Sequence, residues 1–364
     1  MKAAAENDIK GAYPRTLNRQ IHGLRGFSAL AVFVFHIYGM ATLYGFWPSA
    51  LDAASPIFQA GRHGVEIFFA ISGYLITASL IRHGDARAFL IDRAIRIYPV
   101  FLTIHLIVFA LGPFIHYKWM AGIGPFDWTV AFVSNALFLP GIFDLPLAQL
   151  NAATLSYEAA FYLFSAGIFI MSRRLGRRAA IIALVLLLPP IFFVFQKMVF
   201  FPVGAAVYFI VSGRKTTLPA VFRALSVPAL LLCLGILTVA EETHRFYLVY
   251  PAALPAFVFF WSVVDGHCLL SAFLRTRPLQ YLGTVSYSFY LWAPAVTYPL
   301  KILVVRLFGI SDSVGLFVFF GISGLFLSLA VADLSYRLLE DRAGKLLHRR
   351  LAMWRQSGAL QAAE

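Results

Sequence analysis

The sequence has little charge, little cysteine and no long polar stretch, and each scarcity argues against a class of protein. Only 13% of its 364 residues are charged, whereas a soluble domain carries about 25%. The two cysteines, Cys233 and Cys268, lie in or near apolar segments and are expected to be small buried side chains rather than a disulfide. No polar block is long enough for a fused soluble domain, and the polar first 20 residues lack the apolar core of a cleaved signal.

Apolar sequence is what the chain has in abundance. Hydrophobic residues make up 60% of it and the mean hydropathy is +0.78, which indicates an integral membrane protein. The apolar runs are too continuous for barrel strands, which alternate with a period of two. Helices satisfy their own backbone in lipid, so the predicted fold class is all-α and polytopic. We predict ten spans of adequate length, at residues 23–43, 64–82, 97–116, 154–172, 179–196, 198–212, 223–240, 246–264, 281–305 and 313–338.

The distribution of the net charge of +13 predicts the orientation of these spans. Basic residues gather after every even-numbered span, at Arg82, Arg87, Arg93 and Arg96, Arg173, Arg174, Arg177 and Arg178, Arg214, Lys215 and Arg223, and Arg275 and Arg277. The opposite side carries fewer, at Lys118, Lys197, Arg245 and Arg306. By the positive-inside rule, both termini are cytosolic. Topology then accounts for most of the positive charge, so the expected partner is the lipid bilayer and not nucleic acid.

We expect three parts along the chain. Residues 1–20 form a cytosolic tail, residues 21–342 form the transmembrane domain, and residues 343–364 form a basic cytosolic tail.

The first span carries an arginine and a histidine in helical phase. Arg25 and His36 are eleven residues apart, which is three turns plus about 20°, so they share a face and lie about 16 Å apart along the axis. A polar pair is costly inside a membrane and requires a reason. A packing histidine bonded to a carbonyl is the structural alternative, but the in-phase arginine favours function.

Two glutamates are predicted near His36. Glu66 begins the second span and Glu158 enters the fourth from the same, outer side. A histidine beside a carboxylate is the usual construction of a general base, and either glutamate could orient His36. The alternative is that each is a solvated helix start, where acids suit the helix dipole.

Two further groups of polar residues stand near the membrane surfaces. Arg93 and Arg96 are neighbours on a helix before Pro99 and suit phosphate recognition, although the positive-inside rule alone places cations there. The ninth span has a polar and aromatic face at Ser286, Tyr287, Ser288, Tyr290 and Trp292. Helix packing and interface aromatics are the alternative for that face.

The tenth span ends in a pair of opposite charges. Arg337 and Glu340 could pair across one turn of its helix, and we expect that bridge to be structural.

Together these motifs resemble the membrane acyltransferase-3 family, from Ile21 to about Arg342. The resemblance rests on six segments in family order: His22-Gly23-Leu24-Arg25-Gly26 through His36; Gly64-Val65-Glu66-Ile67-Phe68-Phe69 through Ile76; Phe89, Arg93, Arg96, Ile97 and Pro99; Ser156-Tyr157-Glu158 with Phe161-Tyr162; Leu282-Gly283 through Trp292; and Ser335-Tyr336-Arg337 with Glu340. The spacing of Arg25 and His36 alone would be a weak signal, but six ordered motifs are specific.

The sequence departs from the family pattern at several positions. Ala293 follows the Leu-Trp pair where the family often has histidine, so any role of that histidine is absent or displaced. Asp92 replaces the first arginine of a usual pair, and Glu66 replaces a common aspartate with its charge preserved. The final segment reads Glu340-Asp341-Arg342 without the usual proline.

The resemblance implies transfer of an acyl group, commonly acetyl, from cytosolic acyl-CoA to a carbohydrate outside the bacterial inner membrane. Arg25, Arg93 and Arg96 would hold the phosphates of acetyl-CoA. His36 would act as the general base or as the acyl-accepting nucleophile. Ser286, Tyr287, Tyr290 and Trp292 would contact the substrate, no metal is expected, and polysaccharide-assembly proteins are potential partners.

Two other classes of protein compete with this interpretation. A proton-coupled transporter would also have ten spans with an intramembrane histidine and carboxylates, but the two halves of the sequence share no motif. A structural subunit of a polysaccharide-assembly complex would tolerate apolar replacement of its histidine and glutamates.

Overall fold

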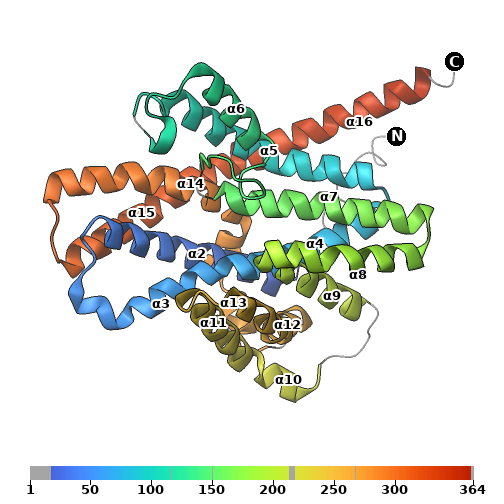
Figure 1. Ribbon diagram of the computed structural model, residues 1–364, viewed down its shortest axis with the longest axis horizontal. Helices are drawn as coiled ribbons and strands as arrows, with labels where there is room; N and C mark the ends of the chain where they lie inside the picture. Colours follow the sequence, from blue (N-terminus) through green and yellow to red (C-terminus); the bar gives the residue numbers. More distant parts are fainter. Residues whose placement is uncertain (1–17, 116, 150, 213–217, 267, 362–364) are drawn as a thin grey trace.

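The computed structural model describes residues 18–361 apart from 116, 150, 213–217 and 267. Within this part the chain is helical, and its β-structure is limited to an isolated bridge between Pro140 and Phe143. Figure 1 shows long helices running side by side, with α6 (Pro125–Ala136) on one edge and α16 (Gly344–Gln361) projecting past the others. The all-α prediction is confirmed.

A helix stands at each of the ten predicted spans. They are α2 (Arg19–Leu43), α4 (Gly64–His83), α5 (Ala86–Leu111), α7 (Ala152–Arg174), α8 (Arg177–Val194), α9 (Phe200–Ser212), α11 (Ser226–Glu242), α12 (Val249–Asp265), α14 (Arg277–Phe308) and α15 (Val314–Ser335). Eight helical segments of the described chain are long and apolar enough to cross a membrane. Because α9 and α11 have only 13 and 17 residues, the number of crossings and the orientation stay predictions.

The short elements lie in the connections between these helices. They are α3 (Ser55–Ala60), α10 (Ala220–Ala224) and α13 (Ser271–Leu274), with 3-10 turns at Ser49–Ala54, Gly61–His63, Lys118–Met120, Gln196–Val199 and Phe246–Leu248. The connections after α2 and α14 are joined at the surface, where Ser49 donates its hydroxyl and its backbone N–H to Asp312, at 2.6 and 2.7 Å. These bonds lower the pKa of the Asp312 carboxyl.

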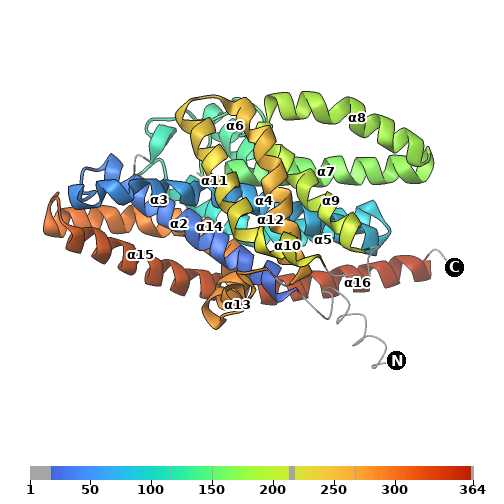
Figure 2. The same ribbon diagram turned by 90° about the horizontal axis from the view of Figure 1, so that it is seen from below.

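The C-terminal end is helical well beyond the predicted domain boundary at 342. A π-helical segment, Tyr336–Ala343, joins α15 to α16, and Figure 2 shows α15 and α16 extending in line along one side of the molecule. The predicted N-terminal tail, residues 1–20, lies outside the described residues except for Asn18 to Gln20.

Glycines bring two pairs of helices into backbone contact. A Cβ added at Gly73 of α4 would lie 1.9 Å from the Phe201 carbonyl oxygen, and one at Gly204 of α9 would lie 1.8 Å from that of Ala70. Gly26 of α2 and Gly283 of α14 meet in the same way. Small residues of this kind allow helices to pack closely in lipid, and here they fix α2 against α14 and α4 against α9.

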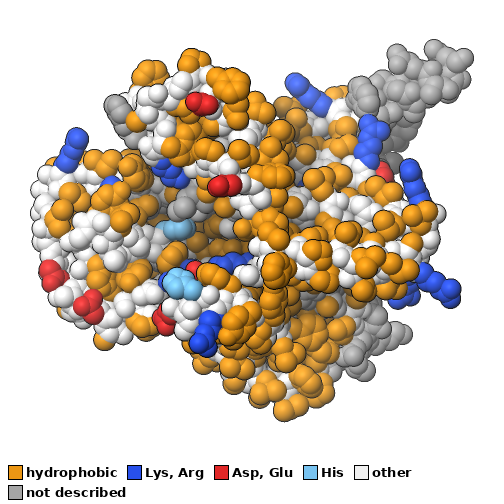
Figure 3. All heavy atoms as spheres, viewed as in Figure 1, with side chains coloured by type: hydrophobic (Ala, Val, Ile, Leu, Met, Phe, Trp, Pro, Cys, Tyr) orange, Lys and Arg blue, Asp and Glu red, His pale blue; other side chains and the backbone are white. Residues whose placement is uncertain are grey.

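The surface is apolar, as a lipid environment requires. Helix α8 buries only Ala180, and large side chains such as Phe193 and Leu254 are mostly exposed on the outside. Figure 3 shows hydrophobic side chains spread across one face, with a hollow between α6, α7 and α14 where histidine and basic side chains appear. These observations identify a multi-pass membrane protein.

Candidate active site

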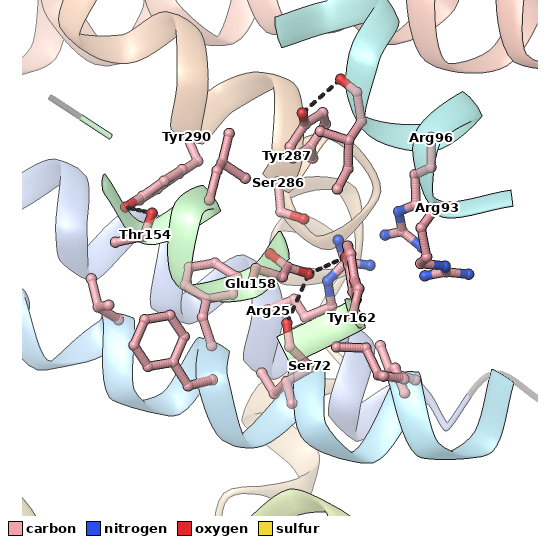
Figure 4. Close-up of a pocket in the computed structure, with 18 residues that line it drawn as sticks. Arg25, Ser72, Arg93, Arg96, Thr154, Glu158, Tyr162, Ser286, Tyr287 and Tyr290 are labelled. Carbon is pink, nitrogen blue, oxygen red and sulfur yellow. Dashed lines mark hydrogen bonds between the residues drawn. The ribbon is translucent and has the colours of Figure 1, made fainter. Parts of the chain in front are cut away.

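One cavity collects most of the predicted site residues. It is formed by α2, α4, α5, α7 and α14, and seven of the ten predicted residues line it: Arg25, Arg93, Arg96, Glu158, Ser286, Tyr287 and Tyr290. Figure 4 shows Arg93 and Arg96 at one end, Tyr290 and Thr154 at the other, and Glu158 with Arg25 between them. The cavity therefore brings together helices from the first half of the chain and α14 near its end.

The basic end of the cavity is built by α5, which carries Arg93 and Arg96. Arg93 donates to Asp92 at 2.7 Å and lies 3.4 Å from the Ser79 hydroxyl. Asp92 also lies 3.5 Å from the His348 imidazole of α16. The aspartate that replaces the family's arginine thus serves as the counter-ion of Arg93 and as a contact for the C-terminal helix.

Glu158 occupies the middle of the cavity. Its carboxylate accepts hydrogen bonds from the Tyr162 hydroxyl, one turn along α7, and from the Ser72 hydroxyl of α4 at 3.3 Å. Stacked rings hold the same helices together, since Phe201 of α9 lies between Phe69 at 4.5 Å and Phe161 at 4.4 Å. Figure 4 places Arg25 next to Glu158 and Tyr162. The carboxylate is thus fixed beside an arginine of the cavity.

His36 lies outside this lining and is joined to it by a chain of polar groups. The Asn151 side chain donates to the Tyr290 carbonyl and lies close enough to the His36 imidazole to influence it. The Thr154 hydroxyl donates to the Asn151 carbonyl at 2.8 Å and lies 2.9 Å from the Tyr290 hydroxyl. These contacts connect His36 to the end of the cavity opposite Arg93 and Arg96.

Asn151 and Thr154 were not predicted from the sequence. The only signal was an asparagine just before the apolar helix that carries Glu158, which is the normal place for a helix cap. In the structure Asn151 occupies the N-cap position of α7, but its side chain makes no capping bond. The amide is directed to His36 and Tyr290, which is a tertiary contact that the local pattern does not encode.

Glu66 belongs to a different cluster. Its side chain is buried, with 1% exposed, and its carboxylate lies 3.0 Å from the Lys197 ammonium and 3.8 Å from the His63 imidazole. Lys197 is also 4.0 Å from Glu241, which pairs with Arg62 at 3.4 Å. The expected contact between Glu66 and His36 is replaced by an ion-pair network between α4, α11 and the turn after α8.

The polar face of α14 is divided between the cavity and the protein interior. Tyr287 donates to the Ile97 carbonyl at 2.8 Å, which holds α14 on α5, and Ser286 donates to the Gly283 carbonyl at 2.9 Å. Trp292 packs against the core outside the cavity lining, with its indole N–H buried and without a hydrogen-bond partner among the described residues.

The predicted bridge between Arg337 and Glu340 is wrong. Arg337 pairs with Asp333 at 2.7 Å, one turn earlier. Glu340 instead accepts from the Ser288 hydroxyl at 2.5 Å and from the Ser288 N–H at 3.2 Å. The prediction assumed α-helical spacing, whereas this segment is a π-helix.

The described residues contain no group of three or more histidine, cysteine, aspartate or glutamate side chains that could hold a metal ion. What the site offers instead is an arginine-rich end suited to anions, and an imidazole with an amide nearby, which is suited to proton transfer.

Such a cavity in a polytopic helical protein defines a membrane protein with a polar site between its helices. Residues 18–337 match the family model described as an acyltransferase domain, and the chain belongs to this acyltransferase-3 family. The resemblance seen in the motifs is confirmed.

Curated relatives extend beyond the region that they share with this chain. A Listeria monocytogenes protein named peptidoglycan O-acetyltransferase OatA is 23% identical over 90% of this chain and 56% of its own length. A Bacillus subtilis protein provisionally named a peptidoglycan O-acetyltransferase is 26% identical over 88% of this chain and 54% of its own. Nodulation protein 10 of Rhizobium leguminosarum is 37% identical over 24% of this chain and 23% of its own length.

The chain thus spans about half the length of the two peptidoglycan O-acetyltransferase relatives. No solved structure matches it significantly.

Proposed function

We propose that this chain is a transmembrane O-acetyltransferase of the bacterial inner membrane. It moves an acetyl group from cytosolic acetyl-CoA to a hydroxyl of an exported or cell-surface carbohydrate. The observation that carries the proposal is a single cavity with Arg93 and Arg96 at one end and the polar chain to His36 at the other. Family membership and the names of two relatives support acetyl transfer to a carbohydrate.

The basic end is proposed to hold the donor. Arg25, Arg93 and Arg96 line the cavity from two helices, and guanidinium groups bind phosphates through charge-assisted hydrogen bonds. The pantetheine arm would then extend past Glu158 toward Thr154 and Tyr290. This arrangement brings the thioester toward the end of the cavity that is connected to His36.

His36 is proposed to move the proton of the acceptor hydroxyl. In direct transfer, the hydroxyl oxygen attacks the thioester carbonyl carbon as His36 takes its proton. The carbon–sulfur bond then breaks and the proton passes to the thiolate, which leaves as CoA. In the covalent route, an imidazole nitrogen attacks the thioester carbon, the carbon–sulfur bond breaks, and CoA leaves as the thiol with the imidazole proton. The acceptor hydroxyl oxygen then attacks the acetyl carbon, the carbon–nitrogen bond breaks, and the hydroxyl proton returns to the imidazole. In both routes Asn151 holds the imidazole in one orientation, a role for which the sequence had suggested Glu158 or Glu66.

Glu158 is proposed to act on the donor side of the cavity. It contacts Tyr162 and Ser72 and lies next to Arg25. A carboxylate in this position holds Arg25 in the cavity rather than orienting His36.

Donor binding tests the proposal. The purified protein in nanodiscs should be stabilised against heat by acetyl-CoA, and Arg96→Ala should weaken that binding about tenfold because one charge-assisted contact is lost. Arg174→Ala is the matched control, since Arg174 is an exposed arginine at the end of α7 outside the cavity. Absence of acetyl-CoA binding by the unaltered protein would overturn the proposal and favour the transporter.

A further inference from the structure

The π-helical segment Tyr336–Ala343 is a feature that the proposed function does not use. π-helices are rare and often occur at functional sites, because an i to i+5 bonding pattern widens the turn. This segment follows α15 directly and carries Tyr336, Arg337 and Glu340 of the last family-like motif, whose Ser335 ends α15.

The wider turn brings Ser335 and Glu340 onto one face. In an α-helix, five residues rotate by about 500°, which would separate the two side chains by about 140° around the axis. Here both reach Ser288 of α14: the Ser288 and Ser335 hydroxyls are 3.0 Å apart, and the Ser288 hydroxyl donates to Glu340 at 2.5 Å. The Ser288 backbone N–H adds a second bond to the same carboxylate oxygen. The Glu340 carboxylate is therefore held at a fixed place.

That place adjoins the basic end of the cavity. Ser286 and Tyr287, directly before Ser288, line the cavity, and Arg96 and Arg25 are the cationic neighbours that act on Glu340. Converging guanidinium groups repel one another in a membrane interior, where the low dielectric strengthens the repulsion. Arg93 has Asp92 as its counter-ion and Arg25 lies next to Glu158, so Glu340 is a further acid within this group of arginines.

We propose that Glu340 is a positioning residue of the donor site. Fixed by Ser288, its carboxylate supplies the negative charge that keeps Arg25 and Arg96 gathered at the cavity in the geometry that the phosphates of acetyl-CoA require. This proposal rests on the proposed function. It assigns Glu340 no contact with the reacting atoms.

The test separates the charge of Glu340 from its hydrogen bonds. Glu340→Gln keeps an acceptor oxygen for Ser288 but removes the charge, so the KM for acetyl-CoA should rise about tenfold with kcat little changed. Glu340→Asp keeps the charge and should recover part of the affinity. Asp341→Asn is the matched control, because Asp341 is the next acid in the same segment and pairs only with Lys345 among the described residues.

A double-mutant cycle with Ser288 completes the test. Ser288→Ala should raise the KM for acetyl-CoA by itself, but should add little in the Glu340→Gln background, because both changes release the same arginines. An unchanged KM in Glu340→Gln, with or without a fall in Tm, would show a purely structural bond and overturn the proposal. A lowered KM would also overturn it, since Glu340 would then compete with the donor. If the unaltered protein and Asp341→Asn bind no acetyl-CoA, the proposed function itself fails.

Discussion

At the scale of single residues, the contacts distinguish two kinds of buried polar group. His36 lies near the Asn151 amide, which contacts Tyr290 of the cavity, whereas Glu66 has ionic partners that join helices. His105 shows a third arrangement, because it is fully buried among Phe101, Phe109 and Phe132, with neither ring nitrogen hydrogen-bonded to a described residue. Residue type alone, a polar side chain in an apolar helix, does not separate these cases.

The Glu66 network should contribute to stability rather than to chemistry. Glu66→Gln leaves Lys197 and His63 without their carboxylate, and the free energy of unfolding should fall by about 2 kcal/mol, less than for a fully buried pair because Lys197 is 40% exposed. Thermal unfolding of the purified protein would show the lowered Tm, while kcat per folded molecule should stay close to that of the unaltered protein.

The double variant Glu66→Leu with Lys197→Leu removes both charges and should recover much of the loss in stability. If Glu66→Gln abolished turnover at an unchanged Tm, Glu66 would have to be returned to the catalytic group.

Site residues on long helices could be predicted from the sequence more readily than site residues in the connections between helices. The in-phase pair Arg25 and His36, and the neighbours Arg93 and Arg96, follow from helical spacing, and the three arginines share one cavity. The partner of Glu66 was unpredictable, because Lys197 reads as a loop residue between two apolar runs. Asn151 was missed for the same reason: its role depends on how α7 begins beside α2 and α14.

At the scale of helices, the apolar runs located all ten predicted helices because hydropathy and length determine them directly. The same reasoning missed the π-helical segment, since its turn depends on Ser335 and Glu340 both meeting Ser288 of another helix. It also gave no sign of which helices pack together. The glycines at the contacts of α4 with α9 and of α2 with α14 indicate these pairings only once the neighbouring residues are known.

The contact between α4 and α9 provides a prediction about helix packing. Gly204→Ala places a methyl group 1.8 Å from a backbone carbonyl, which cannot move as a flexible side chain would, so the variant should lose about 1–3 kcal/mol of stability. Gly235→Ala in α11 is the matched control, because nothing lies within 4 Å of the added Cβ, and it should be neutral or stabilising by up to about 1 kcal/mol. Thermal unfolding in one detergent compares the two.

Equal stability of the Gly204→Ala and Gly235→Ala variants would contradict the close packing of α4 on α9. Since Phe69 of α4 lines the cavity and stacks on Phe201 of α9, a destabilised Gly204→Ala protein should also bind acetyl-CoA less tightly.

At the scale of the whole molecule, the protein combines an apolar exterior with a polar cavity that is built from five helices. The arginines and His36 are connected to opposite ends of that cavity, which is the arrangement needed to bring a phosphate-rich donor and a carbohydrate hydroxyl to one place. The chain covers about half of each peptidoglycan O-acetyltransferase relative. The fold therefore does not identify the carbohydrate acceptor or any protein that delivers it, and both are part of the proposal.

The most direct test of the account is His36-dependent release of CoA by the purified protein in nanodiscs, given acetyl-CoA and a carbohydrate acceptor. His36→Ala should reduce release by at least about a hundredfold while keeping the Tm and the affinity for acetyl-CoA. His105→Phe, which replaces another intramembrane histidine surrounded by aromatic rings, should release CoA at the normal rate. Normal CoA release by His36→Ala, or equal loss in both variants, would contradict the account.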